Sequence, residues 1–155
     1  MAIKTYEEMN ELGLDILKEI GTIGGGNAAT ALSSMLNSQV TMAVPSVKIL
    51  DYNAALGSLG DPEELVAAIF VEMSGELGGI MLFVLTKEVS DEILFRMLGK
   101  KDSDLLALEE IDSSVLIEIG NIVISSYITA MSSLTGVNVE LSVPQLAINM
   151  LGGIM

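Results

Sequence analysis

Glu118 and Asn121 are two strongly polar side chains inside a long run of apolar and small residues that spans 113–144. An α-helix advances about 100° per residue, so Ser114, Glu118 and Asn121 fall within roughly 60° of one another on one face. The face continues with small side chains and one large apolar one, Ser125, Ser132 and Ile128. A carboxylate and a carboxamide one turn apart, among small neighbours, form a surface that another macromolecule could approach closely.

The elements that position these residues are a long helix, predicted over 105–134 and ended by Gly136, and a strand over 137–143. The other side of this helix is expected to face a core through apolar side chains, Leu116, Ile119, Ala130, Met131 and Leu134. The run 115–131 is apolar enough to resemble a membrane span, but it contains Glu118 and Asn121. We therefore expect a buried amphipathic helix and no membrane association.

The same pattern occurs 99 residues earlier in the chain. From Leu14 to Pro45, 12 of 32 positions are identical to the later stretch without a gap. The four pairs that matter here are Asp15 with Ser114, Glu19 with Glu118, Thr22 with Asn121, and Pro45 with Pro144. We interpret this as a duplicated helix–strand unit in one pseudo-symmetric domain over 1–155, with repeat one at about 5–99 and a partial repeat two at about 105–155.

Repeat one predicts a helix that begins between residues 5 and 8 and ends near 36, and a strand over 40–50 in which Pro45 favours an edge or a bulge. A loop over 51–61, with or without a short helical turn, a hairpin of 65–73 with 80–85, and a helix over 87–98 complete the repeat. Thr86 is the expected N-cap of that last helix and Gly99 its end. The fold class is thus α/β, with two long helices packed on a mostly antiparallel sheet.

The segment 24–26 consists of three glycines inside the first predicted helix, at a cost of roughly 2–3 kcal/mol relative to alanine. Either the helix kinks there, or glycine permits close approach of a facing helix or partner. A phosphate-binding P-loop is not the preferred interpretation, because no Gly-Lys-Ser/Thr follows the glycines and no strand precedes them.

Bulk composition narrows the function classes. The chain of 155 residues has 7 basic and 21 acidic residues, a net charge of −14, which argues against nucleic acid and anionic membranes as partners. It has no Cys and no His, so we expect no thiolate chemistry, no Ser–His triad and no histidine metal site. The acidic N-terminus does not have the pattern of a signal peptide, which favours a cytoplasmic protein.

The second repeat stops early in this sequence. Counterparts of the hairpin 65–85 and of the helix 87–98 are missing, so the C-terminal part is expected to be truncated. The apolar segment 146–155 would then leave a hydrophobic patch and a free sheet edge.

The duplicated spacing, Asp/Ser-x3-Glu-x2-Asn-x22-Pro, resembles that of the CheC family of chemotaxis phosphatases, which includes CheC-, CheX- and FliY-like proteins. The copy at Ser114, Glu118, Asn121 and Pro144 matches in full, whereas the copy at Asp15, Glu19, Thr22 and Pro45 has Thr22 where the family has Asn. The resemblance extends from about residue 12 to 144. It implies that Glu118 and Asn121 are catalytic, that Asp15, Glu19 and Thr22 form a degenerate second site, and that Ser114, Pro45 and Pro144 belong to the motif.

The resemblance further implies an enzyme that dephosphorylates the phosphoaspartate of the response regulator CheY. Asn121 would hold a water in line with the scissile P–O bond, and Glu118 would pair with a cation of the receiver. The protein would need no cofactor or metal of its own, because the divalent metal lies on the partner receiver domain. The alternatives are a non-enzymatic flagellar-switch component, a regulator of the receptor deamidase CheD, or a scaffold with a vestigial site.

Overall fold

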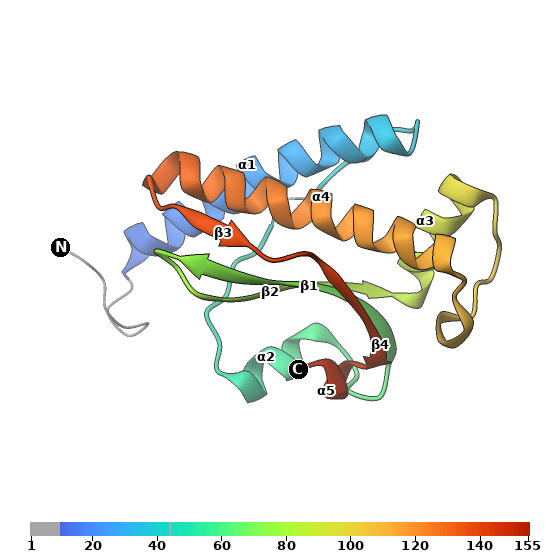
Figure 1. Cartoon of the computed structure of the whole chain (residues 1–155). Helices are drawn as coiled ribbons and strands as arrows, with labels where there is room; N and C mark the ends of the chain where they lie inside the picture. The colour runs from blue at the N-terminus through green and yellow to red at the C-terminus, as the bar shows by residue number, and fades with distance from the viewer. Residues whose placement is uncertain (1–9, 44) are drawn as a thin grey trace.

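The computed structural model describes residues 10–43 and 45–155 and has an α/β architecture (Figure 1). Its helices are α1 (Glu11–Met35), α2 (Tyr52–Leu59), α3 (Lys87–Leu98), α4 (Glu110–Thr135) and α5 (Leu151–Ile154), with a 3₁₀ turn at Leu105–Ala107. Its strands are β1 (Leu65–Gly75), β2 (Gly79–Thr86), β3 (Val139–Leu141) and β4 (Gln145–Met150). Helices α1, α3 and α4 lie on one side of the sheet and α2 and α5 on the other (Figure 1).

Strand β1 is the centre of an antiparallel sheet. It pairs with β2 along one edge and with β3 and then β4 along the other. Its apolar residues Ala67, Ile69 and Val71 alternate toward the helices and join one core cluster with α3 and α4. The prediction of two long helices on a mostly antiparallel sheet is therefore confirmed.

The predicted hairpin and the helix after it are confirmed at nearly the expected bounds. Thr86 caps α3, because its hydroxyl accepts from the backbone N–H of Val89. Gly99 ends the helix in the left-handed conformation at φ 71°. Strand β2 and helix α3 are thereby joined without a loop, and α3 is directed back across the sheet.

Helix α1 is continuous through its three glycines, and close approach accounts for two of them, Gly24 and Gly25, while Gly26 lies in open space. A Cβ on Gly24 would lie 2.8 Å from the backbone Cα of Tyr127 on α4. The two long helices therefore touch where only a hydrogen fits. On α4, Gly120 has the same role toward the sheet, because a Cβ there would lie 2.5 Å from that of Ile69 on β1.

The predicted strand over 40–50 is wrong. None of its described residues forms a strand; instead, the segment runs along α1, where a Cβ on Gly21 would lie 3.3 Å from the ring of Pro45. A strand requires a neighbour for its backbone groups. In the second repeat that neighbour is β1, which pairs with both β3 and β4.

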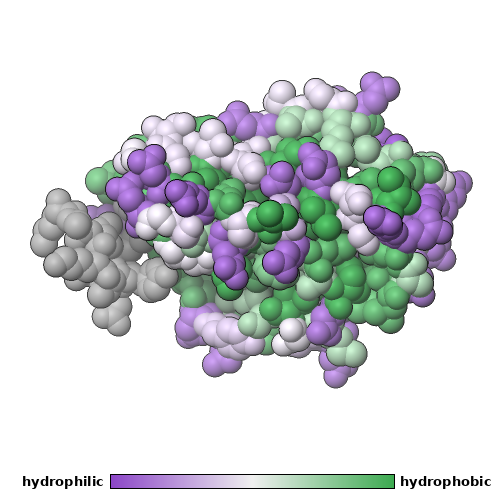
Figure 2. All heavy atoms as spheres, in the orientation of Figure 1, coloured by the Kyte–Doolittle hydropathy of each residue, from purple (hydrophilic) through white to green (hydrophobic). Residues whose placement is uncertain are grey.

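The C-terminal tail, in contrast, is more ordered than expected. Residues 145–150 form β4 on β1, and α5 follows, so the tail packs on the first repeat's hairpin. Part of the expected apolar surface remains, since Val143 is 80% and Met150 is 54% exposed. Figure 2 shows hydrophobic residues reaching the surface below α4, on the face where β3 and β4 lie.

Three finer predictions are corrected. Helix α4 begins at Glu110 rather than 105, since a 3₁₀ turn precedes it. Leu134 is 47% exposed, although it was expected in the core, whereas Ile128 is buried in the core cluster and does not interrupt the polar face. Helix α1 begins at Glu11, capped by the side chain of Asn10. The expected start between residues 5 and 8 lies outside the described residues.

Candidate functional site

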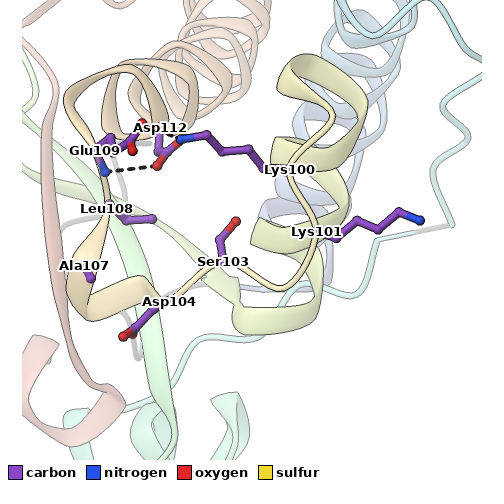
Figure 3. Close-up of a pocket in the computed structure, with 8 residues that line it drawn as sticks. All are labelled: Lys100, Lys101, Ser103, Asp104, Ala107, Leu108, Glu109 and Asp112. Atoms are coloured by element: carbon purple, nitrogen blue, oxygen red, sulfur yellow. Dashed lines mark hydrogen bonds and ion pairs between the residues drawn. The ribbon is translucent and has the colours of Figure 1, made fainter.

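The start of α4 is anchored by a buried carboxylate. Asp112 is 4% exposed, accepts a 3.0 Å hydrogen bond from the backbone N–H of Glu109, and lies 2.7 Å from Lys100 Nζ (Figure 3). Burial favours the neutral acid, but the ion pair with Lys100 and the hydrogen bond from the backbone of Glu109 outweigh it. The net effect is to lower the pKa of Asp112. This ion pair ties the connector after α3 to the first turn of α4.

A pocket of about 390 Å³ lies beside this ion pair, between the connector 100–104 and the first turn of α4 (Figure 3). A further pocket, lined by Glu109, Glu110, Ile111 and Ser114, borders the first motif residue of α4. Both lie at the N-terminal end of the helix, one or more turns before Glu118.

The predicted catalytic pair lies on the outer surface of α4. Leu116 and Ile119 are fully buried against the core, so Glu118 and Asn121 must face away from it. Glu118 is exposed and Asn121 is half-buried. The pair therefore lies on a helix packed on the core, and Glu118 is the more exposed of its two side chains.

The hydroxyls around this pair form different hydrogen bonds. Ser114 donates to the carbonyl of Glu110 at 2.9 Å, so its hydroxyl serves its own helix. Ser125 donates to Asn121 Oδ1 at 3.4 Å, a contact between side chains. Sequence reasoning placed Ser125 on the face without a role; the spacing of four residues was the available signal.

The counterpart on α1 is present but built differently. Asp15, Glu19 and Thr22 are all exposed on one face of the helix. The Thr22 hydroxyl donates to the carbonyl of Lys18 at 2.9 Å, and Lys18 Nζ lies 3.8 Å from Asp15. This half-site has a cation where α4 has Ile117, and no carboxamide, so its chemistry differs from that of α4.

The two motif prolines lie outside both helical faces. Pro144 lies between β3 and β4, where three residues, 142–144, face two residues of β1, as in a β-bulge. Pro45 contacts α1 at Gly21. A proline cannot donate to a ladder, so a bulge fits Pro144, and both positions agree with a structural role.

Helix α4 is, among the described residues, the one helix long and apolar enough to cross a membrane by length and composition. A core helix passes the same test. Five of its buried residues, Val115, Leu116, Ile119, Ile124 and Ile128, belong to the cluster shared with β1, β2 and α3, which is the packing expected of a core helix.

Known proteins are similar to this chain in both repeats. The CheC-like family matches the chain twice, over residues 12–49 and 111–148, separated by the same 99 residues as the internal repeat. The chain is 34% identical to the CheY-P phosphatase CheC of Bacillus subtilis, over 97% of this chain and 73% of that protein. The chain belongs to the CheC-like family.

Two FliY proteins and a FliG–FliM complex are also similar to this chain. The flagellar motor switch phosphatase FliY of Bacillus subtilis is 30% identical over 92% of this chain, which covers 37% of that protein. The crystal structure of Thermotoga maritima FliY has a TM-score of 0.76 at 27% identity, over 93% of this chain and 72% of that one. A structure of the FliG–FliM complex from H. pylori matches at a TM-score of 0.72 and 18% identity, over 95% and 78%, and shows likeness of fold alone.

Proposed function

We propose that the chain is a phosphatase that hydrolyses the phosphoaspartate of a CheY-type response regulator in the cytoplasm. The observation that carries the proposal is the pair on α4: an exposed Glu118 and a half-buried Asn121, one turn apart on a helix fixed to the core. The relative named CheY-P phosphatase CheC, 34% identical over nearly the whole chain, supports the same activity.

Asn121 supplies an acceptor and two donors at the end of a short, half-buried side chain. Inserted into a receiver's phosphorylation site, Asn121 would hold one water in line with the phosphorus, and a divalent metal bound to the receiver would supply charge neutralisation. Attack of this water breaks the P–O bond to the aspartate and releases inorganic phosphate. The contribution of the phosphatase is then positioning of the nucleophile rather than acid–base chemistry.

Glu118 serves docking. Its carboxylate is exposed to solvent in the free protein and can pair with a cation of the receiver when the two surfaces meet. Receiver and phosphatase would thereby come together in one register, with Asn121 over the acyl phosphate.

Phosphate release from phosphorylated CheY, measured with and without the protein, tests the proposal. We expect catalytic release by the parent and a loss of at least about tenfold in turnover for Asn121→Ala, as is typical of lost positioning. Binding of an inert phosphoryl mimic should change less. An unchanged turnover number in a folded Asn121→Ala variant would contradict the assignment.

A second candidate is a flagellar-switch component. The fold of the FliG–FliM complex favours it, because the same fold there belongs to a switch protein, whereas the FliY relative combines the motor switch with a phosphatase in its name. This candidate predicts binding to a switch protein without phosphate release. Binding of CheD stays a prediction of the sequence.

A further inference from the structure

We infer that Ser125 is a positioning residue that orients the carboxamide of Asn121, an inference that rests on the proposed function. The Ser125 hydroxyl donates to Asn121 Oδ1 at 3.4 Å, one helical turn away, and both side chains are half-buried. No other residue is needed to bring the two together, since the helix itself sets their spacing.

The direction of this hydrogen bond sets Ser125 apart from its neighbours. Ser126, the next residue, donates to the backbone carbonyl of Ile122 at 2.7 Å, and Ser114 does the same toward Glu110. Bonding to the carbonyl four residues earlier is the common state of a helical serine. The hydroxyl of Ser125 is instead directed to the functional group on the exposed face.

The chemical consequence concerns which end of the amide meets the water. Rotation of a carboxamide by half a turn exchanges its acceptor oxygen with its donor amino group. A serine hydroxyl can donate to an amide oxygen or accept from an amide nitrogen, so the contact holds the plane of the carboxamide. In the structure Ser125 faces Oδ1, and the amino group lies on the other side. One lone pair of Oδ1 stays available for a proton of the attacking water, so the amide enters the receiver already oriented.

The internal repeat provides an independent comparison. The 99-residue offset places Gly26 at the position of Ser125 and Thr22 at that of Asn121, so α1 has neither the amide nor the orienting hydroxyl. A Cβ added to Gly26 would have nothing within 4 Å, which leaves room for a serine there. The repeat thus allows the pair to be removed from one helix and built on the other.

Removal of the Ser125 hydroxyl is tested by measuring the steady-state release of phosphate from phosphorylated CheY. Ser125→Ala should lower kcat about three- to tenfold and leave KM unchanged, because docking through Glu118 is intact. Ser125→Thr keeps the hydroxyl and should restore most of kcat. Ser126→Ala is the matched control and should resemble the parent.

The same pair of amide and hydroxyl can be built on α1 in a chain with Asn121→Ala, in which the α4 site is expected to be inactive. Thr22→Asn together with Gly26→Ser should give several-fold more turnover than Thr22→Asn together with Gly26→Ala, which controls for the gain in helix propensity. Equal turnover of these two variants would overturn the inference.

The outcomes separate this inference from the function it rests on. Loss of activity in Asn121→Ala with an unchanged kcat in Ser125→Ala overturns the role of Ser125 and leaves the phosphatase assignment standing. Full activity in Asn121→Ala overturns the phosphatase mechanism itself.

Discussion

At the scale of single residues, the two side chains of the proposed site have different surroundings. Glu118 is exposed and hydrated, whereas Asn121 is half-buried and bonded to a neighbour. An exposed carboxylate contributes little until a partner removes its water, when a charge pair becomes worth more. The structure therefore favours a docking role for Glu118 and a positioning role for Asn121.

Replacement of Glu118 by glutamine tests the docking role. Glu118→Gln keeps the shape and removes the charge, so it should weaken association with the receiver and reduce its dependence on salt. Isothermal titration at two ionic strengths measures both quantities. Glu140→Gln, which removes the same charge from an exposed position on β3, is the control and should have a much smaller effect. Equal affinity and salt dependence for Glu118→Gln and the parent would leave Glu118 as a solvated helix residue.

At the scale of elements, α4 is held by a capped start and by a close contact at its middle. Asp112 and Lys100 fix its first turn, Gly136 ends it at φ 72°, and Gly120 allows it to touch β1. These contacts make the helix a fixed support, which positioning catalysis requires.

Two glycine substitutions, one in close contact with the sheet and one in open space, should have opposite effects on stability. Gly120→Ala would place a methyl group 2.5 Å from the fully buried Ile69 and should lower the free energy of unfolding by about 1–3 kcal/mol. Gly26→Ala, in open space on α1, should raise it by up to about 1 kcal/mol, because alanine is the better helix former. Urea denaturation of both variants and the parent measures the difference. A stabilised Gly120→Ala would mean that α4 does not lie this close to β1.

The buried ion pair at the start of α4 predicts a pH dependence. The pKa of Asp112 is lowered in the folded protein, so its contribution to stability is present above the pKa of the unfolded chain, about 4. That contribution is lost as the pH falls through the lower folded pKa. Denaturation between pH 7 and pH 2 should therefore show a steeper acid loss of stability in the parent than in Asp112→Asn. Parallel curves would contradict the shift.

At the scale of the whole molecule, the duplicated helices lie side by side and present two unequal half-sites. Both have a carboxylate, Glu19 or Glu118, and they differ where the water must be held, Thr22 against Asn121. Thr22 is shorter than asparagine and its hydroxyl is already bonded to Lys18. The pseudo-symmetry therefore supplies an internal control.

Truncation of the two carboxylates should separate the half-sites. Glu19→Ala should barely alter turnover of CheY-phosphate, and Glu118→Ala should nearly abolish it. Thr22→Asn in the otherwise unchanged chain should raise turnover by at most about twofold, the limit for two equal and independent sites. Activity that vanishes with Glu19→Ala and survives Glu118→Ala would reverse the assignment of the working helix.

The sequence by itself determined the features that depend on local spacing. The caps at Thr86 and Gly136 follow from residues that stand a few positions apart, and the duplication follows from the identities at an offset of 99 residues. The motif residues of each repeat share one helical face for the same local reason. The hairpin β1–β2 belongs with them, because its two runs of β-forming residues are separated only by a short turn.

The tertiary structure decided what depends on distant partners. Residues 40–43 and 45–50 have strand composition but pair with no strand in the part of the chain that the structure describes, whereas residues 145–150 become β4 because β1 lies beside them. Likewise, only the facing Tyr127 explains why Gly24 is a glycine. Strands pair, and glycines make close contacts, with segments that are far apart in the chain. The residue pattern of a segment is the same whether or not such a partner is present, so the sequence does not reveal the partner.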